Sequence, residues 1–464
     1  MSLFRTKPIG DCNADTGLKR ALGPWDLTFL GIGAIIGAGI FVLTGVAAAT
    51  QAGPAIVLSY VVAGTVCALA ALSYAELAAA VGGSGSAYGY AYAGLGELVA
   101  WIIGWALMLE YGIAVSAVAI GWSGYFANGM TAIGMPLPTD FITGPWQCAQ
   151  AQQCGVINLP AMGIILVLMG LLCIGVAASK WVNSIAVLIK LTVVVLFIFV
   201  AAGNVKTENW ADFMPFGFHG VIGGASLIFF AYIGFDAVST AAEEARNPQK
   251  DLPFGIITSL VVCTFLYILV AGLLTGIVHY STLNNPSPVA QAMLSLGYNW
   301  FAGLIAFGAI CGLTTVMLVV YYGQTRILLA MSRDGLLPRA FSHINPRTKT
   351  PIPVIIGTGL ILATIAGFSP IGAVAEMANI GTLAAFCAVC IGVIVLRYKH
   401  PDLHRPFKTP LMPWLPIAGV AGCFWLMSGL SANTWKYFFS WMAVGLVVYF
   451  LYSMRSSVLA KQAG

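Results

Sequence analysis

Apolar runs of about twenty residues, the length a helix needs to cross the hydrocarbon core of a bilayer, recur along almost the whole chain of 464 residues. Only 8% of the residues are charged, against about a quarter in a typical soluble domain. The sequence therefore predicts an all-α integral membrane protein. Hydropathy places about twelve transmembrane helices at 27–49, 54–80, 96–126, 158–178, 184–203, 219–241, 254–279, 299–330, 352–369, 374–397, 412–431 and 435–453.

The 21 lysines and arginines indicate how these spans are oriented. With the N-terminus in the cytoplasm, 18 of them fall inside, Lys206 and Lys436 fall outside, and Lys190 lies within a span. Positive residues favour the cytoplasmic side of a membrane, so both termini are expected there. The net charge of +5 then reflects the lysines and arginines on the cytoplasmic side of the membrane. It does not indicate nucleic-acid binding, because no basic cluster lies on a soluble domain.

The loops divide the chain into parts. A basic, proline-containing stretch, YKHPDLHRPFKTPL, separates ten spans from the last two and is expected to be a cytoplasmic linker. The predicted parts are a cytoplasmic N-terminal segment at 1–26, a transport core at 27–397 with halves at 27–203 and 219–397, the linker at 398–411, two further spans at 412–453, and a cytoplasmic tail at 454–464.

Two spans carry small residues where a membrane helix is usually continuous. The first contains Gly31, Gly33, Gly37 and Gly39, and the sixth contains GGASLIFFAYIGFDAVS at 223–239. Interrupted segments at matching positions of two halves are the best sequence pointer to a transporter binding site. Because each half has five spans, an odd number, the second half would be inverted in the membrane. The alternative is that these glycines only allow close helix packing.

An unwound span would expose backbone groups with useful chemistry. Such backbone is tolerated in a bilayer only where it lines a protein or water-filled cavity. The free N–H groups at a half-helix N-terminus suit a carboxylate, and free carbonyls opposite them suit an ammonium group. Backbone alone could therefore bind the head group of a zwitterionic amino acid.

Three motifs resemble a known family: GIGAIIGAGIFVLTG at 31–45, GFDAVSTAAEEARNPQKDLPFGI at 234–256 and YGQTRILLAMSRDGLLP at 322–338. They are similar to a bacterial member of the cationic amino acid transporter branch of the amino acid–polyamine–organocation superfamily. The resemblance covers about residues 20 to 455. It implies a five-plus-five inverted repeat, the LeuT-like fold, with two extra C-terminal helices. It also implies uptake of L-amino acids across the inner membrane of a bacterium, typically with protons.

The resemblance also implies where the substrate binds. The carboxylate is expected on the backbone of Ala38 and Gly39, where relatives often carry Ser or Thr in place of Ala38, so that here the backbone must suffice without a hydroxyl. Ile36 and Gly37 are expected to flank the carboxylate. The ammonium group is expected near the carbonyls of Ile35, Phe230, Ala231 and Ile233.

Ionisable residues within spans are costly and are functional hypotheses by default. Lys190 has no carboxylate in its own span, and burial disfavours the charged form of an amine, so proton exchange becomes feasible. The family that the sequence resembles has a lysine here, in place of the sodium site of related sodium-coupled transporters. The resemblance therefore implies that the Lys190 ammonium group mimics that cation and bridges carbonyls of span one to span eight, near Thr314 and Thr315. The alternative is a lysine that snorkels to the interface. Glu110 is either a proton-relay carboxylate or a protonated side chain satisfied by its neighbours.

Aromatic residues are expected to shape the pocket or its gates, with ordinary packing as the alternative; they are Phe229, Tyr232, Phe235 and Tyr321. The span-eight stretch LTTVMLVVYYG contains no acid, whereas a cationic side chain would want a carboxylate in a low-dielectric pocket. Small neutral or apolar amino acids are therefore favoured over cationic ones. Glu76, Glu243 and Glu244 lie near the inner face. They are expected to pair with Arg246, Lys250 or Arg333 in a gate network, with a solvated loop face as the alternative.

Other functions fit less well. A channel would show a selectivity filter, and a membrane enzyme would need a clustered catalytic set. The five histidines lack metal-ligand spacing, so we expect no metal and no cofactor. An exchanger stays open beside a proton symporter. Cys148 and Cys154 could close a small disulfide on the outer face. The expected partners are amino acid, protons and lipid, and an accessory subunit is left open.

Overall fold

The computed structural model describes residues 5–7, 22–81, 86–146, 155–175, 180–240, 245–348 and 350–462. These residues form helices, and their only β-structure is an isolated bridge between Leu22 and Ala245. The principal helices are α1 (Pro24–Ile35), α2 (Thr44–Ala47), α3 (Ile56–Val81), α4 (Ser86–Gly94), α5 (Glu97–Ala132), α6 (Leu159–Ile174), α7 (Lys180–Ala202), α8 (Gly217–Ile228), α9 (Ala237–Thr240), α10 (Pro248–Ile277), α11 (Pro288–Ser295), α12 (Asn299–Arg333), α13 (Ile352–Phe368), α14 (Ile371–Lys399), α15 (Trp414–Ser428) and α16 (Ala432–Val448), followed by short α17 (Met454–Ser456) and α18 (Val458–Gln462).

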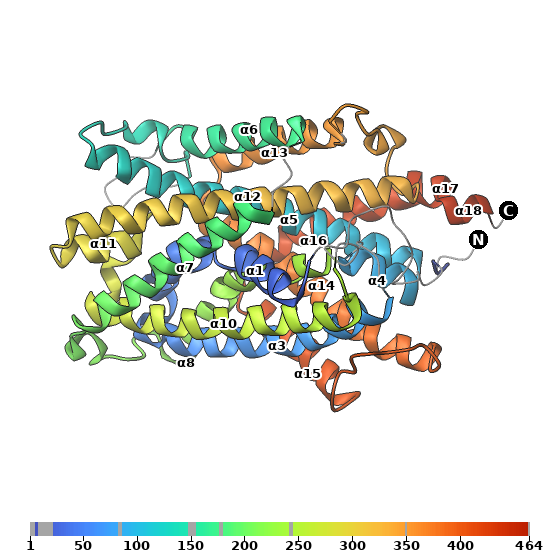
Figure 1. The fold of residues 1–464 in the computed structure, drawn as a ribbon, viewed down its shortest axis with the longest axis horizontal. Helices are drawn as coiled ribbons and strands as arrows, with labels where there is room; N and C mark the ends of the chain where they lie inside the picture. The colour runs from blue at the N-terminus through green and yellow to red at the C-terminus, as the bar shows by residue number, and fades with distance from the viewer. Residues whose placement is uncertain are drawn as a thin grey trace.

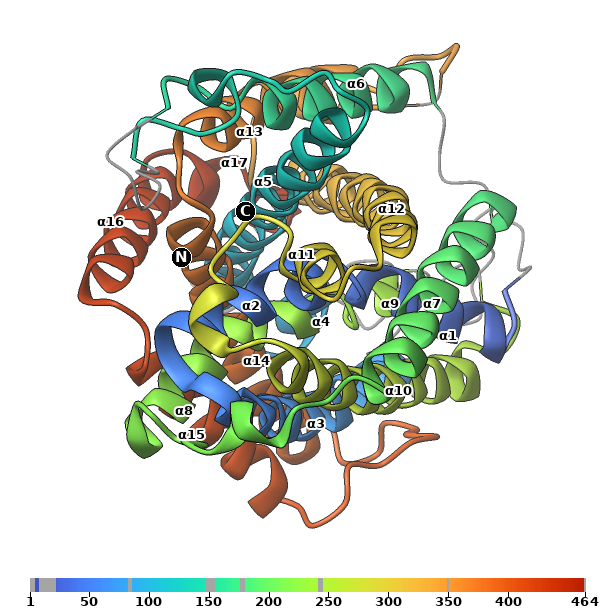
Figure 2. The same ribbon diagram turned by 90° about the vertical axis from the view of Figure 1, so that its left-hand side faces the viewer.

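The long helices α3, α5, α10 and α12 run along the length of the molecule (Figure 1). Viewed along that direction, the short helices α2 and α9 lie in the middle, surrounded by longer ones (Figure 2). The closest packing joins α5 to α12 and α14, and α3 and α1 to α10. Two short pieces of helix therefore sit at the centre of the bundle, where a continuous span would be expected.

Each predicted span coincides with a helix, or with a broken pair of helices, to within several residues. Within the described residues, seven stretches are long and apolar enough to cross a membrane, among them 97–131, 248–277 and 299–333, and four further apolar helices are shorter. Among the described residues, helices outside the predicted spans are α4, which follows α3, α11, which lies in the connection between α10 and α12, and the short α17 and α18 at the C-terminal end. The described chain is therefore an all-helical, apolar bundle as the sequence indicated.

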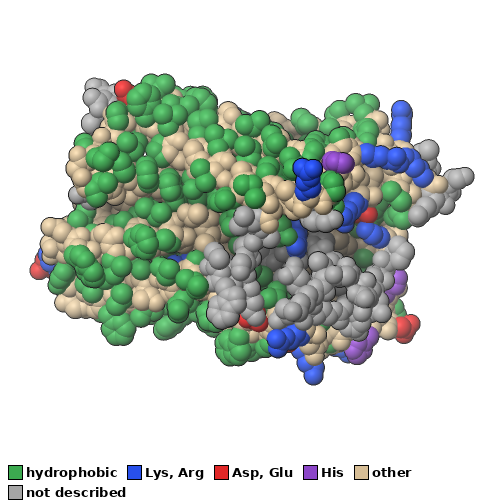
Figure 3. Space-filling view, turned by 45° about the horizontal axis from the view of Figure 1, so that its top comes forward, with side chains coloured by type: hydrophobic (Ala, Val, Ile, Leu, Met, Phe, Trp, Pro, Cys, Tyr) green, Lys and Arg blue, Asp and Glu red, His purple; other side chains and the backbone are tan. Residues whose placement is uncertain are grey.

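Charged side chains are unevenly distributed over the surface. Figure 3 shows lysine and arginine side chains gathered toward the end that carries the termini in Figure 1, while apolar side chains cover most of the remaining length. At that end, the Lys7 ammonium lies 2.8 Å from a carboxylate oxygen of Asp334. The N–H of Val458 donates to the carbonyl of the same aspartate at 3.0 Å. Described residues near the two ends of the chain, Lys7 and Val458, thus contact the turn that follows α12.

The predicted partners of Glu76 were wrong. Its buried carboxylate, at the end of α3, accepts two hydrogen bonds from Arg397 at 2.6 and 2.8 Å and one from the N–H of Thr409 at 2.7 Å. The Arg405 guanidinium lies 3.4 Å away. These residues belong to the end of α14 and to the linker, so Glu76 anchors the 398–411 segment to α3. The sequence could not show that these helix ends are neighbours.

Candidate functional site

The first span is broken between α1 and a π-helical turn, η1 (Gly39–Leu43). Ile36 leaves the helical conformation, with a ψ of 97°. The chain resumes helical geometry at Ala38, and the first hydrogen bond of the outer piece runs from Phe41 N to Gly37 O at 3.4 Å. The N–H groups that precede this bond have no acceptor within the helix. They form a half-helix N-terminus, which favours an anion.

The sixth span is broken after α8. The 3₁₀ turn η6 (Phe229–Tyr232) ends at Ile233, which has a ψ of 131°, and Gly234 then adopts a φ of +119° before α9 begins. A side chain at this φ would be strained. The Ile233 N–H donates to Phe230 O at 3.2 Å. A glycine is therefore required at the point where the chain turns back into helix.

The two breaks lie directly against each other. A Cβ on Gly39 would fall 2.3 Å from the Cα of Ala231, and a Cβ on Gly234 would fall 2.9 Å from the carbonyl group of Ala34. Each break thus brings a glycine against the backbone of the other. Gly39 and Gly234 do both things that were weighed for these glycines, because they lie at the breaks and allow close packing, whereas Gly31 and Gly33 lie within the continuous helix α1.

A tyrosine that the sequence did not single out joins the breaks. The buried hydroxyl of Tyr267, on α10, lies 2.8 Å from Ile35 O and 2.9 Å from Ala231 O. These are two of the carbonyls expected to face a substrate ammonium group. No signal in the sequence distinguishes this tyrosine from others in apolar helices, because its role depends on the packing of α10 against α1.

Lys190 is fully buried, and it contacts the first break. Its ammonium group donates to Gly33 O and to Ile36 O, the latter at 2.9 Å. Its aliphatic stem packs against α12. A Cβ placed on Gly312 would lie 3.3 Å from carbon atoms of the Lys190 side chain. The lysine is therefore a link between α7, α12 and the end of α1, and it does not snorkel to an interface.

Comparison with known proteins identifies the family. Residues 22–450 match the amino acid permease family. The chain is 50% identical to a branched-chain amino acid permease of Bacillus subtilis over 99% of both proteins. It is 49% identical to a methylthioribose transporter of the same organism, over 99% of this chain and all of that protein. A vacuolar cationic amino acid transporter of Arabidopsis thaliana is more distant, with 38% identity over 83% of this chain and 64% of that protein.

The chain belongs to the amino acid permease family. The resemblance to the amino acid–polyamine–organocation superfamily is thereby confirmed, while the cationic transporters within it are the more distant relatives. In this permease the two hydroxyls proposed to face Lys190 have other partners. Thr315 donates to Gly312 O at 2.8 Å, beside the lysine stem, and Thr314 accepts from the Trp122 indole at 3.0 Å.

Two buried carboxylates of the permease lie near each other, Glu110 on α5 and Asp236 beside the second break. Asp236 accepts a hydrogen bond from Tyr111 at 2.5 Å. Among the described residues, neither carboxylate oxygen of Glu110 has a hydrogen-bond partner. The nearby Thr382 hydroxyl donates to Ala378 O at 3.0 Å. Because leaving a buried charge without partners is costly, this geometry favours a neutral, protonated Glu110.

The aromatic residues proposed for the pocket separate into groups. Phe229 and Phe235 both pack on Phe386 of α14, with ring centroids 5.9 and 4.9 Å apart. Tyr232 packs beside Tyr60 and Tyr267. Tyr321 is directed elsewhere, because its hydroxyl bonds Ile355 O on α13 at 2.5 Å. The first three therefore belong to the second break itself, and Tyr321 lies between α12 and α13.

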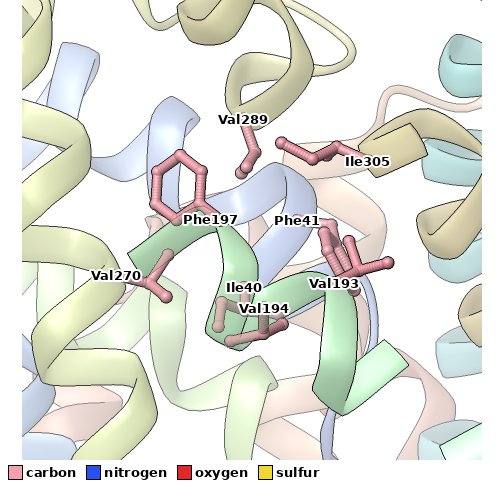
Figure 4. A pocket seen from close by; sticks show the side chains of 8 residues that line it. All are labelled: Ile40, Phe41, Val193, Val194, Phe197, Val270, Val289 and Ile305. Atoms are coloured by element: carbon pink, nitrogen blue, oxygen red, sulfur yellow. The ribbon is translucent and has the colours of Figure 1, made fainter. Parts of the chain in front are cut away.

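A small apolar cavity of about 10 Å³ lies next to the outer piece of span one. Figure 4 shows its lining side chains converging from that piece, α7, α10, α11 and α12; they are Ile40, Phe41, Val193, Val194, Phe197, Val270, Val289 and Ile305. Its volume is at the lower limit for one water molecule, and an apolar void of this kind stays dry. This cavity is too small and too apolar for a zwitterion. The backbone groups of the breaks suit a zwitterion better. Cys148, Cys154, Glu243 and Glu244 lie outside the described residues.

Proposed function

We propose that this permease is a proton-coupled symporter of apolar L-amino acids that works by alternating access. The observation that carries the proposal is the contact between the two breaks at Gly39 and Ala231. It brings a helix N-terminus with free N–H groups next to carbonyls of Ile35 and Ala231. An amino acid head group has a negative and a positive charge on adjacent atoms, so it can use both sets at once.

In this proposal the carboxylate binds the N–H groups of Ala38 and Gly39, flanked by Ile36 and Gly37. The ammonium group binds carbonyls of the two breaks. Tyr267 occupies two of these carbonyls in the present structure, so its hydroxyl would yield to the substrate or share them with it. The remaining proposed acceptors are the carbonyls of Phe230 and Ile233.

The choice of an apolar substrate rests on the surroundings of the breaks. The residues packed against them are mostly aliphatic or aromatic, as Val316 beside Gly37 and the cluster of Phe229, Phe235 and Phe386 illustrate. A cationic side chain would need a partner carboxylate there. The 50% identity to a branched-chain amino acid permease supports the same choice. A second candidate substrate is methylthioribose, because the relative of that name is almost equally similar to this chain.

Proton coupling is proposed for Lys190 and Glu110. Lys190 places a titratable amine on the carbonyls of Gly33 and Ile36, so loss of its proton would remove the charge that strengthens these hydrogen bonds and would weaken the link between α7 and the first break. Glu110 lies near Asp236, beside the second break. Both breaks therefore have a buried ionisable group next to them, and protonation could bias their movement. We retain Thr314 and Thr315 as groups that could receive the lysine in another conformation.

We further propose a five-plus-five inverted repeat followed by two extra helices, α15 and α16, in the inner membrane of a bacterium. The matching breaks, five spans apart, support the repeat. The gathering of lysine and arginine at one end supports cytoplasmic termini (Figure 3). Lipid would cover the exposed apolar side chains, of which Phe199, Phe265 and Ile361 are examples.

Uptake by purified permease in liposomes tests the proposal. Labelled branched-chain, small neutral and cationic amino acids, and methylthioribose, are offered with and without an acid-outside gradient. We expect the gradient to drive accumulation of apolar amino acids above equilibrium. Flux that ignores the gradient and requires internal amino acid would make the protein an exchanger, and saturation-free flux of many solutes would make it a channel. Uptake of methylthioribose alone would establish the second candidate.

A further inference from the structure

The outer piece of span one begins with a turn whose geometry is fixed by side chains. Thr44 Oγ1 lies 3.0 Å from Gly39 O, and the Thr44 N–H donates to the same carbonyl. The Tyr60 hydroxyl, from α3, lies 2.6 Å from Thr44 Oγ1 and 3.4 Å from Gly39 O. All three residues are buried. The Gly39 carbonyl, at the first break, thus lies within hydrogen-bonding distance of two hydroxyl groups.

Counting protons gives the direction of these bonds. Each hydroxyl has one proton to donate, and the contact of Tyr60 with Gly39 O is the longest of the three. If each hydroxyl donates its proton to the nearest acceptor that is still free, Tyr60 donates to Thr44 Oγ1 and Thr44 donates to Gly39 O. Hydrogen bonds in such a chain strengthen one another. The pair therefore acts as one unit on the carbonyl.

The bond to Gly39 O determines where the neighbouring N–H groups point. A backbone donor five residues on takes this carbonyl, so the turn is a π-turn, one residue wider than an α-turn. In a planar trans peptide the C=O and N–H point in opposite directions. With Gly39 O held toward Thr44 and Tyr60, the N–H of Ile40, in the same peptide group, points back toward the break. The N–H groups of Ala38 and Gly39 belong to the two preceding peptide groups, so they adjoin this turn at the same half-helix N-terminus.

We infer that Thr44 and Tyr60 are positioning residues for the carboxylate of an α-amino acid substrate. This inference rests on the proposed function, because it assumes that the carboxylate binds at this half-helix N-terminus. Neither side chain needs to touch the substrate. Their hydroxyls hold the π-turn that presents the N–H groups, in a chain where Ala38 supplies no hydroxyl of its own.

The chain offers a matched control on the same segment. The Thr50 hydroxyl also bonds a backbone carbonyl, that of Val46 at 2.8 Å, but it is exposed and lies away from the break. Thr44→Val and Thr50→Val remove the same group from the same half-helix. Thr44→Ser keeps the hydroxyl, and Tyr60→Phe removes the second member of the unit.

The test measures KM and kcat for a transported apolar amino acid, together with inhibition by its carboxamide, which keeps the ammonium group and side chain but has no anionic carboxylate. We expect Thr44→Val and Tyr60→Phe to raise KM about tenfold or more, the equivalent of one charge-assisted hydrogen bond. The apparent affinity for the carboxamide and kcat should stay within about twofold of the wild type. Thr44→Ser and Thr50→Val should match the wild type.

An unchanged KM in Thr44→Val, or an equal loss of affinity for the amino acid and its carboxamide, would overturn the inference. If Thr44→Val fails to fold, Tyr60→Phe and Thr44→Ser decide the question, since the first should behave as described and the second should restore normal KM. Failure of the proposed function looks different, because the wild type itself would then not distinguish the amino acid from its carboxamide, or would not transport amino acids.

Discussion

The Cα of Ala231 lies 2.3 Å from where a Cβ on Gly39 would be placed. Side-chain Cβ atoms do not approach other atoms so closely, so only glycine fits at this contact between the two breaks. Residue 39 is also the start of the outer piece of span one. The same glycine therefore permits both the interruption of the first span and its contact with the sixth.

Gly39→Ala should abolish transport without preventing insertion of the protein in the membrane. The added methyl group must push the breaks apart, which costs about 1–3 kcal/mol for an overpacked site and displaces the proposed ammonium acceptors. We expect initial uptake to fall more than about tenfold, as misplacement near a binding site commonly does. Gly170→Ala on α6 is the control, because nothing lies within 4 Å of its Cβ position. Wild-type uptake by Gly39→Ala would contradict the proposed site.

Lys190→Ala should stop proton-driven accumulation. The substitution leaves the carbonyls of Gly33 and Ile36 without their donor and removes the amine whose protonation is proposed to link α7 to the first break. Accumulation under an acid-outside gradient should fall to the level of liposomes without a gradient. Lys436→Ala, on α16 and outside the core, should behave like the wild type. Undiminished proton-driven uptake by Lys190→Ala would remove the lysine from the coupling mechanism.

Glu110→Gln imitates the protonated side chain at nearly constant volume. Since the structure favours a neutral Glu110, the variant should fold and exchange internal for external amino acid, yet fail to accumulate substrate against a gradient. Counterflow and gradient-driven uptake, measured on the same liposomes, separate the two activities. Glu208→Gln, an exposed loop carboxylate, is the control. If Glu110→Gln accumulates substrate normally, Glu110 has no part in proton coupling.

The sequence predicted what local patterns determine. Hydropathy located the helices, and glycines at 31–39 and 223–234 located the breaks, because apolar length and glycine content act within one segment. Partnerships between distant segments were not predictable in the same way. Tyr267 and Thr44 became visible as site residues only when packing brought their hydroxyls to carbonyls of a break. Lys190 could be identified from the sequence, because an ionisable residue within an apolar span indicates a functional role even when its partners are unknown.

The partners of Glu76 were also not predictable from the sequence, because they lie on distant segments. They lead to a prediction about stability. The expected gate partners were Arg246, Lys250 and Arg333, whereas the structure joins Glu76 to Arg397 and to the linker residue Thr409. Its carboxylate is 2% exposed. Glu76→Ala therefore leaves a guanidinium and an N–H without their acceptor in a mostly buried place.

Glu76→Ala should destabilise the permease by about 3–5 kcal/mol, as expected when one partner of a buried ion pair is removed. Lys7→Met is the comparison, because Lys7 pairs with Asp334 but is half exposed, and exposed pairs contribute about 0–1 kcal/mol. Thermal unfolding in detergent should show a much lower midpoint for Glu76→Ala and a nearly unchanged one for Lys7→Met. Since Glu76 lies at the α3–linker contact and not at the breaks, the KM of the protein that stays folded should be unchanged. Equal midpoints for the two variants would show that the linker contact does not stabilise the fold, and a raised KM would place Glu76 in the transport mechanism.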